Sequence, residues 1–175
     1  MIKLHKPLPT TITVEGREFF IKTDFRYWLL FSKIIQNKSV KLKDLFFLFE
    51  DEIPVCDFTE ALLDFFINPN STPTGSDDGE RVIDYEEDGE YIYASFMQAY
   101  GIDLFEVNLH WHKFKALILG LPSGTIMSEI MGMRGYKKDN RKLEIIAQEK
   151  KKKWALPNKE EKELLEEIDK LFYNS

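Results

Sequence analysis

Near the start of the chain, apolar and polar residues alternate with the period of two that is typical of a β-strand. The apolar positions of this alternation are Ile12, Val14, Phe19 and Ile21. Glu15-Gly16 separates the two halves, and glycine readily takes the positive φ that a tight hairpin turn requires. The pattern therefore predicts a β-hairpin over residues 8–22. Because a lone hairpin is only marginally stable in water, it has to pack on other elements.

Beyond residue 22 the apolar residues recur every three or four positions, which is the period of a helix. Each helical stretch begins at or just after a residue type that caps helix N-termini. These start positions are Thr23 or Asp24, Ser39, Asp57, Asp84, Asn108, Ser123, Asn140 and Asn158. Gly89 delays the start of the fourth helix by about one turn, and Gly101 ends it. The pattern predicts a mainly α multi-helix fold with a small N-terminal hairpin.

One stretch breaks this helical pattern. Residues 68–79 are rich in Pro, Gly, Ser and Asn and contain no large apolar side chain, which is typical of a loop. We interpret residues 68–83 as an exposed loop within one domain that spans residues 1–175. A boundary between two subdomains is the alternative that this composition leaves open.

The run from Leu45 to Phe49 is apolar nearly all round. In the helix predicted after Ser39, Phe46 and Phe49 share the apolar stripe, whereas Phe47 falls outside it. A strand is the rival assignment, because so short a run does not fix the period. Such a run is either wholly buried or partly offered to a partner. We therefore take Phe46, Phe47 and Phe49, together with Trp111 of a later helix, as candidate partner-binding residues.

Charge is distributed unevenly along this chain, whose net charge is -6. Residues 77–90 are strongly acidic, and residues 134–153 are strongly basic. Such polarity suits head-to-tail self-association or a charged partner. The basic end makes Lys150, Lys151 and Lys152 further partner-binding candidates. A nucleic-acid-associated protein that uses residues 134–153 is the alternative reading, which the negative net charge disfavours.

No motif in the chain predicts catalysis or a cofactor site. Phosphate-binding glycine loops and a nucleophile elbow are absent from the sequence. His110 and His112 lie two positions apart, so on a helix they would face opposite ways, whereas a helical zinc pair needs a spacing of four. We expect no metal, no cofactor and no enzymatic activity.

Two further features bear on location. No apolar run approaches the ~20 residues that span a bilayer, so we expect no membrane partner. Cys56 is the only cysteine, which favours a reducing compartment. These features predict a protein of the cytoplasm.

Several short motifs together resemble a known family. They are Val14–Phe19, Thr23–Arg26, Tyr91–Phe96, Tyr100–Leu104, Leu109–Trp111, Lys113–Leu117 and Trp154–Pro157. Their series is similar to that of the bacteriophage gene-product-fifteen family, from the tail-gene cluster of phages of Gram-positive bacteria. The family carries no agreed catalytic or binding residues, so the resemblance assigns none here.

The resemblance implies a phage tail-assembly factor that acts in the cytoplasm of the host bacterium. Its implied partners are the tape-measure protein or other tail proteins, and self-association is a further option. A chaperone for the long, apolar helices of the tape-measure protein is the specific role that we expect. Aromatic residues make up 14% of the chain, and rings that the core does not cover, such as Phe46, Phe47 and Phe49, could cover such helices.

Overall fold

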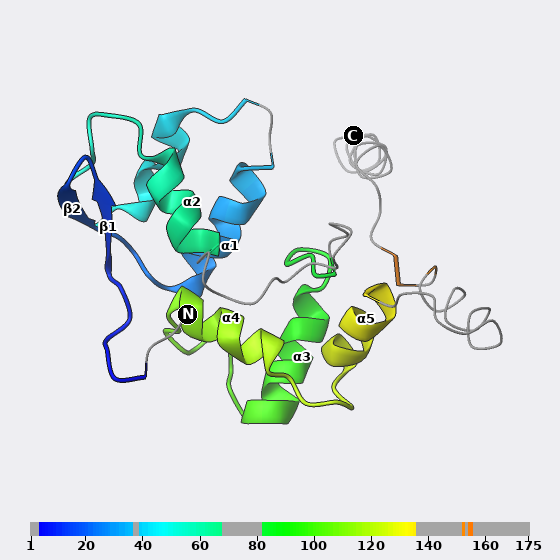
Figure 1. Ribbon diagram of the computed structural model, residues 1–175. Coiled ribbons are helices and arrows are strands. Elements are labelled where there is room, and N and C mark those ends of the chain that lie inside the picture. The colour runs from blue at the N-terminus through cyan, green and yellow to red at the C-terminus, as the bar shows by residue number, and fades with distance from the viewer. Residues whose placement is uncertain (1–3, 37–38, 68–81, 136–151, 153, 156–175) are drawn as a thin grey trace.

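The computed structural model describes residues 4–36, 39–67, 82–135, 152 and 154–155. The chain is mainly α-helical with a two-stranded hairpin at its N-terminus, as the sequence pattern predicts. Figure 1 shows the hairpin beside α2, α1 on the other side of α2, and α4 between these helices and the α3–α5 pair. The buried apolar side chains form one continuous cluster.

The hairpin consists of β1 (Thr11–Val14) and β2 (Arg17–Phe20), which are antiparallel and pair Val14 with Arg17. Glu15 and Gly16 form the two-residue turn, and both have positive φ, at 49° and 79°. Positive φ at both positions is the type I′ geometry that matches the twist of paired strands. The predicted inward positions of both strands are buried, and β1 packs on α2.

Helix α1 (Phe25–Ile34) begins at the predicted cap. Asp24 Oδ1 accepts a hydrogen bond from the Arg26 backbone N–H at 3.0 Å, which satisfies one of the free donors of the first turn. Trp28 and Phe31 are fully buried on the inner face. The Trp28 indole donates to the carbonyl oxygen of Lys22 at 2.9 Å, so burial leaves this N–H paired.

The next element differs from the prediction. It is a 3₁₀ helix, η1 (Leu42–Leu48), whose N-cap position is Lys41 and not Ser39. A 3₁₀ helix has three residues per turn, so its buried stripe falls on Leu45 and Leu48 instead of including Phe46. Phe46 is instead among the exposed large hydrophobic residues. The rival strand assignment is also wrong for this run.

Two predicted capping residues, Asp57 and Asp84, are confirmed near the starts of the following helices. Asp57 Oδ1 accepts from the Thr59 N–H at 2.9 Å and starts α2 (Thr59–Ile67). Asp84 accepts from the backbone N–H groups of Glu86 and Glu87, in a turn that precedes α3 (Gly89–Tyr100). The predicted delay at Gly89 is therefore confirmed. Gly101 ends α3 in the left-handed conformation, with φ 64°.

The starts of the last two helices lie slightly further along the chain than the sequence suggested. The N-cap of α4 (Trp111–Leu119) is His110 and not Asn108, because His110 Nδ1 accepts from the His112 backbone N–H at 3.0 Å. The N-cap of α5 (Ile126–Arg134) is Thr125 and not Ser123. The helices predicted after Asn140 and Asn158 lie outside the described residues.

Residues 68–81 of the predicted loop also lie outside the described part of the chain. Its last two residues are described, and they are not exposed. Ile83 is buried in the core and Val82 packs against it. For these two positions the predicted exposure is wrong, because an apolar pair at the end of the loop joins the core before α3 begins.

Stacked aromatic rings hold the helices together around α4. Phe114 stacks on Phe25 of α1 at 4.6 Å between ring centroids and on Phe96 of α3 at 5.3 Å. Trp111 stacks on Phe66 of α2 at 5.0 Å. Offset and edge-to-face ring pairs contribute about 0.5–1.5 kcal/mol each beyond the area that they bury. Helix α4 is therefore the central element of the fold.

Candidate protein-binding surfaces

The structure separates the four predicted aromatic candidates. Trp111 is completely buried in the core and Phe49 is nearly so, since Phe49 forms an isolated β-bridge with Ile21. Neither ring is available at the surface in this conformation. Phe46 is exposed and Phe47 is partly buried, so among the four predicted candidates only these two rings on η1 reach the surface.

The exposed side of η1 forms a small apolar surface with α1. Leu42 and Phe46 are exposed on η1, and the Phe47 ring lies 6.4 Å from the ring of Tyr27. The ammonium of Lys22 lies 5.1 Å from the Tyr27 ring centroid, within the range of a cation–π contact. This arrangement offers apolar area next to a positive charge.

The basic candidates at the other end of the chain are only partly described. Lys152 is exposed, whereas Lys150 and Lys151 lie outside the described residues. Arg134, the first residue of the basic segment, is buried and forms a two-point ion pair with Asp88 at 2.5 and 2.9 Å. Arg134 also donates to the carbonyl oxygen of Trp154 at 2.6 Å. Its guanidinium is thus committed within the fold and does not face a nucleic-acid phosphate.

A groove of about 580 Å³ lies beside the C-terminal part of α1. Among the described residues its lining is mainly apolar and comes from α1 and the residues just after it, the end of α2 and the segment before α3. The apolar lining residues are Leu29, Leu30, Ile35, Phe66, Ile83 and Tyr85. An ion pair between Lys33 and Glu86 links two of its walls. A volume of this size is typical of ligand clefts in proteins.

Side chains of α4 bind the last carbonyl oxygens of α2, which have no partner within their own helix. His112 Nε2 donates to Phe65 O at 2.9 Å, and the Trp111 indole donates to Phe66 O at 3.0 Å. Lys115 Nζ donates to Phe66 O at 2.8 Å and to the carbonyl oxygen of the next residue at 2.7 Å. A positive charge at this end also complements the helix dipole. We call these three donors the α4 cap of α2.

Burial sets the protonation of these groups. It lowers the pKa of His112 to about 4 and that of Lys115 to about 8, and it also lowers the pKa of His110. At neutral pH both imidazoles are therefore neutral. His110 accepts at Nδ1 from the helix and contacts the Pro9 carbonyl oxygen through Nε2 at 2.9 Å, which requires the Nε2–H form.

The two histidine rings do not face opposite ways, so this prediction was wrong. Their centroids lie 5.1 Å apart, because His110 precedes the helix as its N-cap. Even so, among the described residues no group of three His, Cys, Asp or Glu side chains could hold a metal ion. Both rings serve as hydrogen-bonding groups of the fold.

Sequence reasoning missed the burial of Lys115. A usable signal existed. Trp111, Lys115 and Ile118 follow the spacing of one helix face, which places Lys115 among buried residues. Nothing in the sequence identifies its carbonyl partners, because they belong to a helix almost fifty positions earlier.

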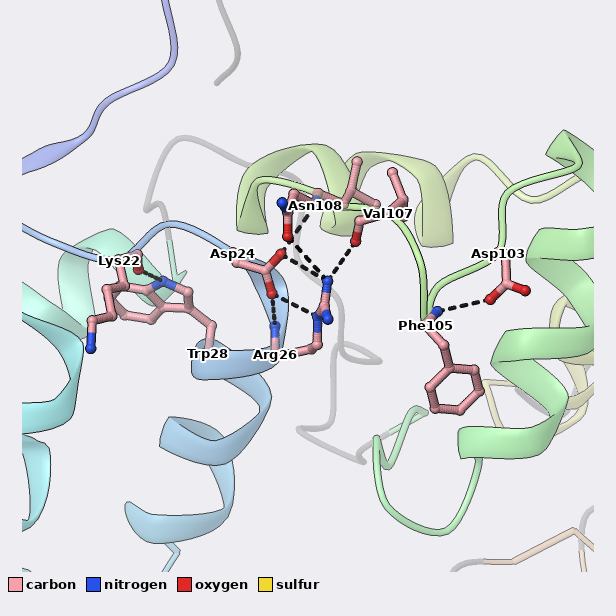
Figure 2. A network of polar contacts seen from close by, with 9 residues as sticks. Lys22, Asp24, Arg26, Trp28, Asp103, Phe105, Val107 and Asn108 are labelled. Carbon is pink, nitrogen blue, oxygen red and sulfur yellow. Dashed lines mark hydrogen bonds and ion pairs between the residues drawn. The ribbon is translucent and has the colours of Figure 1, made fainter.

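A polar network joins the start of α1 to the segment that follows α3 (Figure 2). Arg26 forms an ion pair with Asp24 at 3.0 Å and donates to Val107 O at 2.6 Å. Asp103 Oδ1 accepts from the Phe105 N–H at 2.9 Å. The Phe105 ring itself is 78% exposed, the largest exposure of any aromatic residue among the described exposed hydrophobics. The sequence analysis did not single it out.

Fold and surfaces together define a small, mainly α protein that presents apolar side chains in a groove and at separate places on its exterior. The chain belongs to the Bacteriophage Gp15 protein family, whose sequence pattern matches residues 46–171. The predicted family is thereby confirmed, and the match indicates a phage structural or assembly protein. The hairpin and α1 lie before the matched region.

No curated protein and no solved structure matches the chain. Among the described residues, no helix is both long and apolar enough to cross a membrane.

Proposed function

We propose that this protein is a phage tail-assembly factor that acts as a chaperone for the tape-measure protein. Family membership supports a role in the phage particle or its assembly. The observation that carries the specific role is the apolar groove along α1. In this proposal the protein works by binding, without catalysis, in the cytoplasm of the host bacterium.

The groove suits the side chains of an amphipathic helix. Such helices place apolar residues at three- and four-residue spacing, and they bind by laying that face into an apolar groove. Leu30 is 46% exposed on the groove wall, although it belongs to a helix whose other face is fully buried. Covering that side chain would remove apolar area from water, at about 25 cal/mol per Å².

The segment that links two of the described groove walls carries no large apolar side chain in its sequence. Residues 68–81 connect α2, which supplies Phe66, to the segment that supplies Ile83, and they contain no aromatic or large aliphatic residue. In this proposal a second protein supplies such side chains. Modest affinity at one groove is sufficient, because repeated sites on a long helical client multiply weak binding.

The test is co-expression of the full chain with overlapping fragments of the tape-measure protein from the same phage. We expect at least one fragment to become soluble and to co-purify with the chain. Leu30→Glu should abolish this complex, because it places a charge in the apolar groove.

Val55→Glu is the matched control, since Val55 is fully exposed and does not line the groove. This variant should retain the complex. Fragments that stay insoluble with the wild-type chain would contradict the proposal, as would equal binding by the two variants.

A further inference from the structure

The strongest unexplained feature outside the groove is the turn that presents Phe105. This turn is firmly held by hydrogen bonds. The Asp103 carbonyl oxygen accepts from Glu106 N at 3.2 Å and from Val107 N at 3.1 Å, and its carboxylate accepts from Phe105 N. Arg26 fixes the far end of the turn through Val107 O.

The ring of Phe105 has an aromatic neighbour on α3. Its centroid lies 5.3 Å from that of Tyr93, whose hydroxyl donates to Asp103 Oδ2 at 3.3 Å. Met97, one helical turn further on, is also exposed and shares this face of α3. The turn and the helix therefore form one surface, which we call the Phe105 surface: Tyr93, Met97, Asp103, Phe105 and Glu106.

The charged members of this surface, Asp103 and Glu106, are both acidic, and the cation Arg26 is bonded to the turn at its far end, where it contacts Val107 O. Residues 82–110 contain seven Asp and Glu residues and not one Lys or Arg. Two of these carboxylates are neutralised from other helices, Asp88 by Arg134 and Glu86 by Lys33. Glu106 on the turn and Glu90, three residues before Tyr93, are exposed. The two acidic groups of the turn also raise the pKa of Tyr93, after the contribution of desolvation.

We propose that the Phe105 surface binds a basic, apolar segment of another protein, in which a large apolar side chain is flanked by Lys or Arg. The fixed ring supplies the apolar contact at little cost in conformational entropy, as binding hot spots do. The surrounding carboxylates select positive charge and repel nucleic acid. This site is separate from the groove along α1 and does not depend on its occupant.

The test uses overlapping synthetic peptides that cover the tail proteins of the same phage, with the full chain titrated against each by fluorescence anisotropy. The bound peptides should contain an apolar residue next to Lys or Arg. Changing those basic residues to Gln should weaken binding at least tenfold, and raising the salt from 0.1 to 0.5 M should weaken it several-fold.

Phe105→Ala should weaken binding at least tenfold, and Glu106→Lys should do so to a similar degree. Phe20→Ala is the matched control, because Phe20 is 56% exposed on the hairpin, and it should change binding less than twofold. Both phenylalanines are exposed, so neither variant empties the core.

Unchanged binding by Phe105→Ala would overturn the proposal, and so would bound peptides without basic residues or an absence of any bound peptide. Conversion of a wild-type dimer to a monomer by Phe105→Ala would instead assign the surface to a second copy of the chain, which also overturns it. None of these outcomes affects the Leu30→Glu test of the groove.

Discussion

Two Asp–Arg pairs in this molecule show how context changes the role of the same two side chains. Asp24 and Arg26 lie two positions apart at the start of α1, with side chains that are 17% and 45% exposed. Asp88 and Arg134 lie 46 positions apart and join the start of α3 to the end of α5, with side chains that are 1% and 8% exposed. The exposed pair forms locally, whereas the buried pair requires the fold.

The environment also sets the energetic consequence of each pair. Water screens the exposed pair and can replace either partner, so such pairs contribute about 0–1 kcal/mol. The buried pair has lost its hydration, and either partner left alone would be an uncompensated charge. Asp88 also accepts from Asp84 N at 2.8 Å, which extends the buried network into the turn before α3. Removing one buried partner should therefore matter far more.

The largest effect is expected for Asp88→Asn. It leaves the buried guanidinium of Arg134 without its counter-charge and should lower the free energy of unfolding by about 3–5 kcal/mol. Urea denaturation followed by circular dichroism measures the change. The double variant Asp88→Leu/Arg134→Met should recover part of the loss, since it buries no charge. If Asp88→Asn lowered the free energy of unfolding by less than about 1 kcal/mol, the buried pair would matter no more than the exposed one, which would contradict the comparison.

Acid should destabilise the protein through His112, which is buried as a neutral ring, whereas Asp88 and Arg134 are buried as an ion pair. The folded state holds the pKa of His112 at about 4, below its ordinary value of 6.5, so the unfolded chain binds this proton more readily. Stability should be fully present above about pH 6.5 and fall as the pH is lowered towards 4. Between pH 7 and pH 4.5, His112 should lower the free energy of unfolding by about 2 kcal/mol.

Urea titrations at several pH values measure this dependence. His112→Gln provides the reference, because its amide can still donate to the Phe65 carbonyl oxygen but does not take up a proton. The variant should lose less stability than the wild type over the same pH range. Parallel curves for the two proteins would exclude His112 as the cause.

Arg26→Ala should have a smaller effect, about 1 kcal/mol. It removes an exposed ion pair together with the donor to Val107 O, and solvent around the exposed guanidinium keeps this loss near the typical ~0.5–1.5 kcal/mol of a single hydrogen bond. Arg26→Lys should recover less than half of the loss, because an ammonium cannot contact Asp24 and Val107 O with the same planar geometry. A loss above about 3 kcal/mol would mean that the exposed pair behaves like the buried one.

The smallest expected effect is the change in these stability costs with salt concentration, which should differ between the two pairs. Between 0.05 and 1 M NaCl, the cost of Arg26→Ala should shrink by a few tenths of a kcal/mol, because ions screen exposed charges. The cost of Asp88→Asn should stay constant within error, since buried charges are screened much less. If the stability cost of the two variants changed equally with salt, the proposed difference between the exposed and the buried pair would be wrong.

The two pairs also mark what the sequence could predict. The Asp24 cap, the Gly101 stop and the Glu15-Gly16 turn all depend on residues within a few positions of one another, and all three predictions are confirmed. The Asp88–Arg134 pair depends on two distant segments. From the sequence each residue belonged to a stretch of like charge, which suggested an outside partner instead of one another.

The differences between the predicted pattern and the structure around the candidate residues have similar physical causes. The exposure of Phe46 follows from a 3₁₀ helix, and a short apolar run does not distinguish three residues per turn from 3.6. Burial of Trp111 follows from the central place of α4, which is a property of the whole fold. Phe105 lies in a connector without any periodicity, so its exposure could be found only from the structure.

The α4 cap of α2 has a practical consequence for attaching labels to this protein. The final carbonyl groups of α2 are held by His112, Trp111 and Lys115, so this helix end is supported by side chains that come more than forty positions later in the chain. A peptide tag or fluorophore inserted shortly after Ile67 should leave the helix intact, which offers a reporter site close to the wall of the groove.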